Sequence, residues 1–223
     1  MEIVPMVSVH VPKAGGTSFQ LTLHQFFGNR LWLDHGVPAD PPPHAACIHG
    51  HASARHRLEQ FPEAVLVGWV RDPVERILSQ WRYWRRRPDH GHPVCQRLHD
   101  EDLGPVELAE LLPDVQAQML GDDLARYDFI GVVERAELSM TGLRALLGAS
   151  GLFLPHINLT AAKDVTEAER RAIAERCEAD VETYRHGVER LKAVLTTEPD
   201  RTRLWQWAHA LPGTPVRGYG RAA

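Results

Sequence analysis

Short apolar runs alternate with amphipathic stretches along most of the chain. Runs rich in valine, isoleucine and phenylalanine predict buried strands at 3–11, 63–70 and 129–133, with a shorter one at 31–33. Apolar residues three or four apart predict helices over about 16–27, 54–60, 73–87, 105–120, 136–147, 166–194 and 203–210. Segments 34–52 and 88–104 show neither period and are predicted to be loops. This alternation predicts the α/β class, with a parallel sheet flanked by helices on both faces.

Three helix ends carry sequence signals of their own. Pro73 stands at a first helical position, where proline is favoured because its missing N–H is not needed there. Gly148 follows a helix as its predicted C-cap, and Thr166 with Glu169 fits a capping box. These signals support the helix boundaries that the apolar pattern predicts.

The composition narrows the class of protein. A length of 223 residues predicts a single domain, 1–223, with a core over about 3–195 and a weakly organised tail at 196–223. A net charge of −4 gives no basis for general nucleic-acid binding, so any anion site has to be local. Three widely spaced cysteines predict reduced thiols. Since we find no leader-like segment and no apolar run of membrane-spanning length, we expect a cytoplasmic protein without a membrane anchor.

The segment from Met6 to Phe19 is the first candidate for chemistry. It begins as an apolar strand, breaks at Pro12 and continues through two glycines into a helical pattern. Glycines let the backbone approach an anion, and the amides and dipole of a helix N-terminus attract it. Lys13 supplies a full positive charge, and the hydroxyls of Thr17 and Ser18 can cap the helix or bind the anion.

A second candidate follows the predicted strand at 63–70. Arg71 comes at the end of that strand, and Ser79 follows two helical turns later. A planar guanidinium suits bidentate binding of a phosphate, and a hydroxyl adds a donor. Ligands of parallel α/β sheets bind beyond the carboxyl ends of the strands, so both anion sites are expected at the same edge. Two such sites match a nucleotide that carries phosphates at both its 3' and 5' positions.

The order of residues in the first loop argues against a common nucleoside triphosphate site. In that motif the lysine follows the glycines, whereas Lys13 precedes them. The sequence also shows no convincing acidic strand end for magnesium, because only Asp72 and Glu134 stand at such positions. Two alternatives stay open: a P-loop kinase-like phosphotransferase and a nucleotide-binding module without catalytic activity. The combination of Lys13 with both hydroxyls argues against the second.

Both segments resemble motifs of sulfotransferases that use 3'-phosphoadenosine 5'-phosphosulfate (PAPS). The sequence His10-Val11-Pro12-Lys13-Ala14-Gly15-Gly16-Thr17-Ser18 is similar to their 5'-phosphosulfate loop, and the segment from Val70 to Trp81 is similar to their 3'-phosphate motif. Segments 129–135 and 155–158, which includes Asn158, resemble later blocks of the carbohydrate O-sulfotransferases of the heparan and chondroitin type. The residues that this resemblance assigns to PAPS are Lys13, Ala14, Gly15, Gly16, Thr17, Ser18, Arg71 and Ser79.

The resemblance implies a P-loop-NTPase-like fold and an activity. The enzyme is expected to transfer a sulfuryl group from PAPS to a hydroxyl of a carbohydrate or small-molecule acceptor, releasing 3'-phosphoadenosine 5'-phosphate (PAP). By analogy with phosphoryl transfer, Lys13 stabilises the departing phosphate by in-line displacement, and no metal is required. We expect no nucleic-acid or membrane partner, while the acceptor and the oligomeric state stay open.

A histidine pair before the strand at 63–70 supplies the candidate base. Relatives use a histidine or an acidic residue near this region, and a histidine titrates near neutral pH. His51 is favoured as the base and His49 comes second, with Glu134 as an acidic alternative. His51 can equally serve a structural or substrate-binding role. No third and fourth ligand has metal-site spacing, so no metal centre is predicted.

Several other residues near the two motifs have open roles. Arg76 either contacts the nucleotide or pairs with Asp72 at i,i+4 on a helix surface. Gln116 lies in a segment similar to one near the nucleotide or acceptor in relatives, or on an ordinary polar helix face. The arginines at 82 and 85–87 are interpreted as a solvated helix face rather than an acceptor site. The predicted loops 34–52 and 88–104 are expected to form the walls of the acceptor site.

Overall fold

The computed structural model describes residues 4–34, 40–155 and 165–212. Within them, a five-stranded parallel sheet has the order β2-β3-β1-β4-β5. Its strands are β1 (Met6–Val9), β2 (Leu31–Asp34), β3 (Cys47–Gly50), β4 (Val65–Val70) and β5 (Phe129–Val132). The predicted α/β class is confirmed. The central strand β1 pairs with β3 on one side and with β4 on the other, although neither is its neighbour in sequence.

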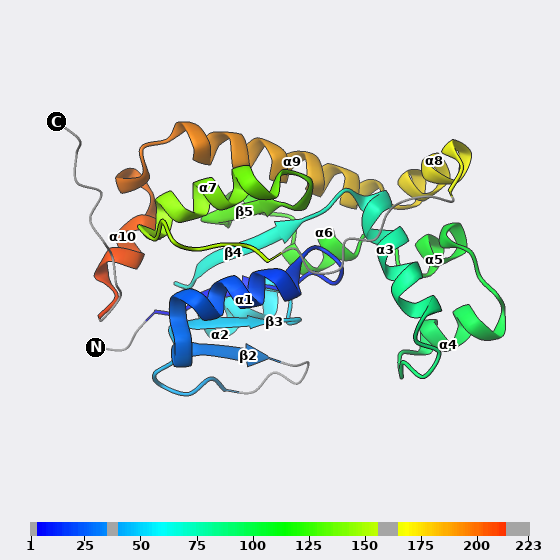
Figure 1. Ribbon diagram of the computed structural model, residues 1–223, viewed down its shortest axis with the longest axis horizontal. Coiled ribbons are helices and arrows are strands. Elements are labelled where there is room, and N and C mark those ends of the chain that lie inside the picture. The colour runs from blue at the N-terminus through cyan, green and yellow to red at the C-terminus, as the bar shows by residue number, and fades with distance from the viewer. Residues whose placement is uncertain (1–3, 35–39, 156–164, 213–223) are drawn as a thin grey trace.

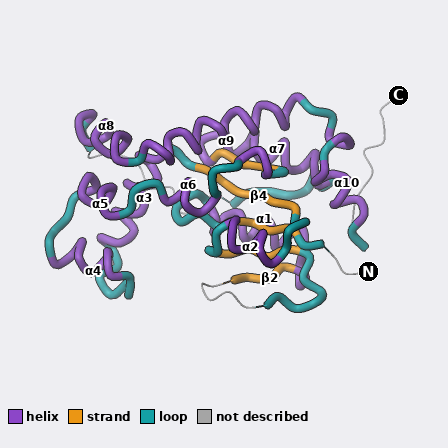
Figure 2. The backbone as a smooth tube through the Cα atoms, turned by 180° about the vertical axis from the view of Figure 1, so that it is seen from behind, coloured by secondary structure: helices purple, strands orange, loops and turns teal. Residues whose placement is uncertain are grey.

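Helices cover both faces of the sheet (Figures 1 and 2). One face carries α1 (Gly16–Phe27), α7 (Ala136–Leu147) and α10 (Arg203–Ala210), and the other carries α2 (Ala54–Gln60), α6 (Val115–Leu120) and α9 (Glu178–Thr196). Phe27 of α1 contacts Trp207 of α10 across the first face, with ring centres 6.1 Å apart. Helices on both faces explain why β1, β4 and β5 are buried along their whole length.

A group of helices forms a lobe beyond the carboxyl ends of the strands, at the right in Figure 1. It consists of α3 (Pro73–Arg85), α4 (Pro93–Asp100), α5 (Pro105–Leu111) and α8 (Glu167–Arg176). This helical lobe has small apolar clusters of its own, one around Ile77 and Leu78 and another around Trp84 and Leu98. The lobe therefore places α3 next to the position that a ligand at the strand ends would occupy.

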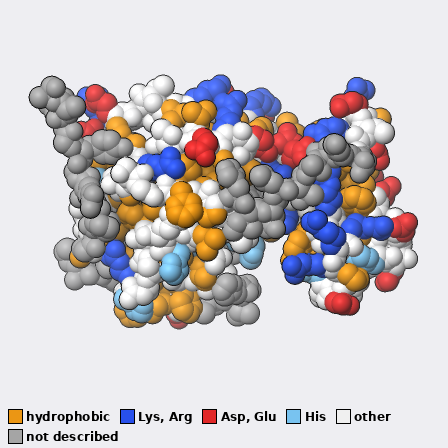
Figure 3. Space-filling view, in the orientation of Figure 1, with side chains coloured by type: hydrophobic (Ala, Val, Ile, Leu, Met, Phe, Trp, Pro, Cys, Tyr) orange, Lys and Arg blue, Asp and Glu red, His pale blue; other side chains and the backbone are white. Residues whose placement is uncertain are grey.

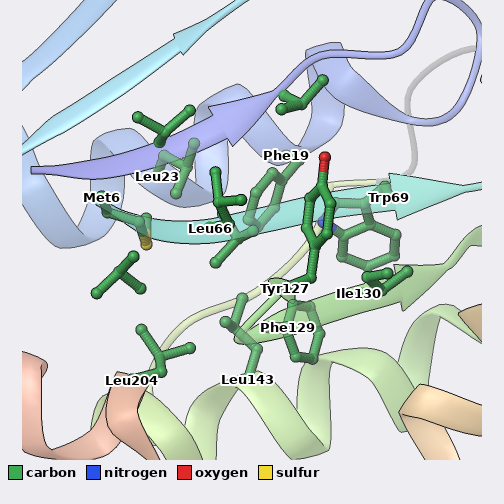
Figure 4. Packing of buried hydrophobic residues seen from close by; sticks show 14 of the residues in the cluster. Met6, Phe19, Leu23, Leu66, Trp69, Tyr127, Phe129, Ile130, Leu143 and Leu204 are labelled. Atoms are coloured by element: carbon green, nitrogen blue, oxygen red, sulfur yellow. The ribbon is translucent and has the colours of Figure 1, made fainter. Parts of the chain in front are cut away.

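The main apolar core lies between the sheet and its helices (Figure 4). Phe19 of α1 and Phe129 of β5 both lie against Trp69 of β4, with ring centres 5.3 and 6.3 Å from it. Tyr127 is also buried, and its hydroxyl donates to the carbonyl of Leu120 at 3.0 Å. These large side chains fix β4 and β5 side by side and so fix where the two strands end.

The structure corrects two predicted loops. Strand β3, in which only Cys47 and Ile48 have apolar side chains, lies within 34–52, and α4 lies within 88–104. Burial between β1 and β2 stabilises β3 although its sequence lacks a strand pattern. Gly50 is needed there, because a Cβ would lie 2.4 Å from the Asp34 carbonyl oxygen. Helix α4 is capped by His92, a residue type that is uncommon as an N-cap.

Two predicted helices are each divided in two. The segment 105–120 forms α5 and α6, and the segment 166–194 forms α8 and α9, which separate at Cys177. The capping box of Thr166 with Glu169 is confirmed, and so is the left-handed C-cap of Gly148, with φ 62°. Most other helix bounds agree with the prediction, and the predicted tail at 196–223 contains α10.

A buried ion pair ties α3 to α9. Arg76 Nε lies 3.3 Å from Asp180 Oδ2, and both side chains are almost fully buried. Asp180 also accepts from the backbone N–H of Ala117 at 2.9 Å, which adds α6 to the network. Of the two roles left open for Arg76, the surface pair with Asp72 is therefore wrong, since the guanidinium points into the interior toward Asp180. Arg76 also lines the cavity described below, so contact with a nucleotide stays a prediction.

Asp180→Ala is expected to lower the free energy of unfolding by roughly 3–5 kcal/mol, because it leaves the Arg76 guanidinium buried without a counter-charge. Urea denaturation measures this change. Glu182→Ala is the matched control on the same helix: it breaks an exposed pair with Arg185 and should cost about 1 kcal/mol or less. Equal losses in the two variants would contradict the structural role of the buried pair.

Candidate active site

A cavity of about 1130 Å³ opens at the carboxyl ends of β1, β4 and β5, between the sheet and the helical lobe. It contains most of the residues that the sequence assigns to the two anion sites. These are Lys13, Gly15, Gly16, Thr17, Ser18, Arg71 and Ser79, and the candidate base His51 also lines it. The loop after β1 and the turn after β4 meet here because these two strands are neighbours in the sheet. The prediction that both segments lie at one sheet edge is therefore confirmed.

The loop after β1 is a tight turn. Lys13 and Gly15 have positive φ angles, 67° and 78°, and the Ala14 amide donates to the Val11 carbonyl at 3.2 Å. Gly16 lies against the ring of His10, where a Cβ would come within 1.9 Å of its Cδ2 atom. Ala14 is buried and does not line the cavity, whereas its neighbours Lys13 and Gly15 do, so the expected contact of Ala14 with PAPS gains no support.

Helix α1 begins at the cavity. Gly15 is its N-cap and has no side chain to offer, and neither Thr17 nor Ser18 caps the helix. Their hydroxyls form no hydrogen bond with another described residue. The amides of a first helical turn also lack partners within the helix. The start of α1 therefore offers a set of donors to an anion, at the positive end of the helix dipole.

Arg71 is held at both its backbone and its side chain. The Gln116 side chain accepts from the Arg71 N–H at 2.8 Å and donates to its carbonyl at 2.9 Å. The guanidinium Nη1 donates to the Lys13 carbonyl at 3.2 Å, which links the two candidate anion sites directly. Its Nε lies 3.8 Å from Glu134 Oε1 and has no hydrogen-bond partner among the described residues. Gln116 thus positions Arg71 instead of lying on a polar helix face.

Helix α3 carries part of the second candidate anion site on its cavity side. Asp72 caps the helix by accepting from the Glu75 amide at 3.0 Å, and Pro73 occupies the first position as predicted. Ser79 and Tyr83, one turn apart, both line the cavity. The Ser79 hydroxyl forms no hydrogen bond within the described part of the chain. It can therefore donate to a phosphate that Arg71 also reaches.

The charge of Lys13 is set by its surroundings. Its Nζ lies 4.1 Å from the ring centre of Tyr83. Burial, followed by the positive charges of Arg71, Arg86 and Arg87, lowers the pKa of Lys13 to about 8. Lys13 is thus held among cations, and a bound anion would relieve the repulsion between them.

Three histidines form a stack beside the loop. The rings of His10 and His51 are 4.2 Å apart, and those of His10 and His49 are 4.8 Å apart. Burial and the neighbouring histidines and Lys13 lower the pKa of His10 to about 2. His51 Nδ1 donates to the His10 carbonyl oxygen at 2.8 Å, which leaves Nε2 of the neutral ring as the basic nitrogen. The structure thus fixes the tautomer of His51.

The other candidate bases differ in their positions. His49 is buried in β3, has its Nδ1 2.8 Å from the Ser8 hydroxyl, and does not line the cavity. Glu134 lines the cavity at the end of β5, accepts from the Asp72 amide at 3.1 Å, and has its pKa raised by burial. Asn158 lies outside the described residues. Of the two histidines proposed as base, His51 is the one at the cavity.

The arginines after Ser79 are divided between two environments. Arg85 pairs with Asp102, and Arg87 lies over Tyr83, with its guanidinium carbon 4.9 Å from the ring centre. Lys and Arg side chains gather on the helical lobe in the space-filling view (Figure 3).

Within 4–34, 40–155 and 165–212, no cluster of three or more potential ligands could hold a metal ion, and no helix is long and apolar enough to cross a membrane.

Several cavity residues were not predicted from the sequence. They are Tyr83, Trp84, His90, His92, Leu112, Met119 and Arg135. Tyr83 could have been found, because it is four residues after Ser79 on the predicted helix and must share its face. His90 and His92 belong to the segment predicted as an acceptor wall, but no local signal distinguishes them from its other polar residues.

Comparison with known proteins finds little similarity. No family model and no curated protein matches the chain. Among solved structures, a crystal structure of the mouse sulfotransferase SULT7A1 complexed with PAP matches with a TM-score of 0.37 and 13% sequence identity, over 96% of this chain and 80% of that chain. A score this low carries no argument about function, so the function is inferred from the residues of this chain.

Lys13→Met is expected to raise the free energy of unfolding at pH 7, because it removes a cation that folding places among other cations. The pKa of Lys13 is 10.5 without such surroundings and about 8 in the fold, so the unfolded chain binds more protons between these pH values. The stability of the unsubstituted protein therefore rises with pH across this window, and the gap to the variant closes. Urea denaturation at pH 7 and pH 10.5 measures both effects.

Lys192→Met is the matched control for this experiment. Lys192 is exposed and pairs with Glu189, so its replacement should change the stability by no more than about 1 kcal/mol at either pH. A Lys13→Met variant that is less stable than the unsubstituted protein at pH 7 would contradict the electrostatic description of the cavity.

Proposed function

We propose that this protein is a sulfotransferase that transfers a sulfuryl group from PAPS to a hydroxyl group of a carbohydrate or small-molecule acceptor. One observation carries the proposal. The glycine loop with Lys13 and the Arg71–Ser79 turn line a single cavity, and the Arg71 guanidinium donates to the Lys13 carbonyl. Two anion sites in direct contact suit a nucleotide with phosphate groups at both its 5' and 3' positions.

The residues present fit PAPS by their donor chemistry. Donors without a hydrogen-bond partner among the described residues gather at both sites: the hydroxyls of Thr17 and Ser18 at one, and Arg71 Nε with the Ser79 hydroxyl at the other. The loop cannot carry larger residues at its glycines, since Gly15 has a positive φ and Gly16 touches His10. Such a cradle of donors supports binding of an anion at the backbone of the loop.

Lys13 is assigned to charge stabilisation. In an in-line transfer, the bond from sulfur to the 5'-phosphate oxygen breaks and the electron pair stays on that oxygen, while a new bond forms from sulfur to the acceptor oxygen. Lys13 and the first-turn amides of α1 can stabilise the negative charge that develops on the leaving phosphate. Because its pKa is about 8, the ammonium is mainly protonated at pH 7 and gains a counter-charge when the anion binds.

His51 is assigned as the base. The acceptor hydroxyl must lose its proton as the new bond forms, and His51 Nε2 can take that proton. The hydrogen bond from Nδ1 to the His10 carbonyl and the stacking of His10 hold the imidazole in one tautomer and orientation. Glu134 is the alternative base at the same cavity.

The cavity has room for more than one ligand. Its volume of about 1130 Å³ exceeds the usual range for pockets that hold a single small molecule, roughly 300–1,000 Å³. The part near α3 and α4 is lined by rings, among them Tyr83, Trp84, His90 and His92. Rings with polar tips can pack against a sugar ring or an aromatic acceptor. We therefore propose that this part holds the acceptor next to the nucleotide.

The direct test is binding followed by turnover. Thermal shift should show stabilisation by PAP at lower concentrations than by ATP, with no requirement for magnesium. A screen of hydroxyl-bearing acceptors with ³⁵S-labelled PAPS should then identify a labelled product. Lys13→Ala should lower turnover by at least about 100-fold while PAP still binds. Stronger binding of ATP with magnesium, together with phosphate transfer, would favour a kinase instead.

Arg71→Ala is expected to weaken PAP binding by roughly 10- to 100-fold, because a charge-assisted hydrogen bond contributes about 1.5–3 kcal/mol. Binding of adenosine 5'-phosphate, which has no 3'-phosphate, should change much less, and Ser79→Ala should show the same preference with a smaller loss. Calorimetric titration of both nucleotides measures the difference. Arg85→Ala, which lies on α3 with Ser79 but is paired with Asp102, is the control. Equal losses for both nucleotides would remove the 3'-phosphate assignment.

His51→Ala is expected to lower kcat by roughly 10²- to 10⁴-fold without changing the affinity for PAP, because general-base catalysis acts on the transfer step. Steady-state kinetics and PAP titration measure the two quantities, with the exposed His24→Ala as control. A larger loss of kcat in Glu134→Gln than in His51→Ala would assign the base role to Glu134.

A further inference from the structure

Tyr83 is the residue that faces the Lys13 ammonium. The Lys13 Nζ lies 4.1 Å from the centre of its ring, within the range of a cation–π interaction. Tyr83 comes from α3, one turn after Ser79, and both residues line the cavity. The ring therefore lies between the loop after β1 and the helix that carries the second anion site.

The charges around Lys13 are mostly of its own sign. Arg71 comes from the end of β4, Arg86 and Arg87 follow α3, and the neutral His10 precedes Lys13 in the loop. Among the described residues, no carboxylate forms an ion pair with Lys13, and Glu134 pairs with Arg71 instead. An ammonium in this position needs a favourable contact that is not a carboxylate.

We propose that Tyr83 is a positioning residue that keeps the Lys13 side chain charged and directed into the cavity. The negative face of its ring stabilises the ammonium at the place where a salt bridge would otherwise do so. A ring has an advantage over a carboxylate here, because it has no net charge and does not repel an incoming anion. Lys13 can therefore exchange the ring for the anion without breaking an ion pair. This inference rests on the proposed function only for the identity of the anion.

The contact of Arg87 with the same ring supports this role. Its guanidinium carbon lies 4.9 Å from the ring centre, so Tyr83 has two cations at its ring. The ring thus offsets repulsion between groups that come from two separate parts of the chain. Removing the ring should lower the pKa of Lys13, whereas a purely structural role for Tyr83 would leave that pKa unchanged.

The test is an NMR titration of the lysine side chains. The sequence contains three lysines, at positions 13, 163 and 192, so a protein labelled with [¹³Cε]lysine gives few signals, and loss of a signal in Lys13→Met assigns Lys13. In Tyr83→Leu and Tyr83→Met, the pKa of Lys13 should fall by about 0.5 to 1.5 pH units. In Tyr83→Phe, which keeps the ring face, it should fall by much less.

Trp81→Leu is the matched control on the same helix. Its ring lies near Arg85 instead of Lys13, and its N–H donates to the Leu103 carbonyl at 2.9 Å. This variant should leave the pKa of Lys13 unchanged. An unchanged pKa in both Tyr83→Leu and Tyr83→Met would overturn the proposal. So would a fall in Trp81→Leu or Tyr83→Phe as large as that in Tyr83→Leu.

A kinetic measurement separates this proposal from the proposed function. If the protein transfers sulfuryl groups, Tyr83→Leu should lower kcat several-fold at pH 7 and shift the alkaline limb of the kcat profile to lower pH. Tyr83→Phe should keep both the kcat and the position of this limb close to those of the unsubstituted protein. An unshifted limb in Tyr83→Leu would contradict the role of the ring in turnover. If the protein shows no turnover but the pKa of Lys13 still falls in Tyr83→Leu, the proposed function is refuted and the inference about Tyr83 stands.

Discussion

The pairing of β1 with β4 is the contact on which the candidate site depends. Met6 to Val9 align with Val65 to Gly68 in a parallel register, so the two strands end side by side. The chain leaves β1 through the loop that carries Lys13 and leaves β4 through the turn that carries Arg71. Neither segment could form the cavity alone. The apolar packing of Phe19 of α1 and Phe129 of β5 against Trp69 helps to hold β4 in this position.

The cavity concentrates positive charge at a cost in stability. Arg71, Arg86 and Arg87 all oppose protonation of Lys13, and the histidines next to the loop oppose protonation of His10. Such repulsion is expected where a protein is prepared for an anion that is not yet bound. The interior elsewhere follows the opposite rule, since the buried Arg76 and Arg57 face Asp180 and Asp34. Arg76 and Arg57 are thus each paired with a buried carboxylate, whereas Lys13 at the cavity forms no ion pair with a carboxylate of the described residues.

Much of the sheet edge could be predicted from the sequence because its signals are local. A strand that ends in a glycine loop before a helix predicts the position of Lys13, and a strand that ends at Arg71 before Pro73 predicts the second site. The place of β3 between β1 and β2 could not be predicted, since burial rather than its own pattern makes it a strand. The pairing of Arg76 with Asp180 was missed for a similar reason, because more than a hundred positions separate them in the sequence.

The hydrogen bonds of Gln116 couple the position of Arg71 to a helix on the other face of the sheet. The side-chain amide of Gln116 forms hydrogen bonds with both the N–H and the carbonyl of Arg71, as the backbone of a neighbouring strand would. It therefore holds the backbone one residue beyond the end of β4. Gln116 belongs to α6, which packs against α2 and α9 on the face of the sheet away from α1. A displacement of α6 would therefore move the guanidinium at the cavity. The far face of the sheet is thus connected to the candidate anion site through the side-chain amide of Gln116.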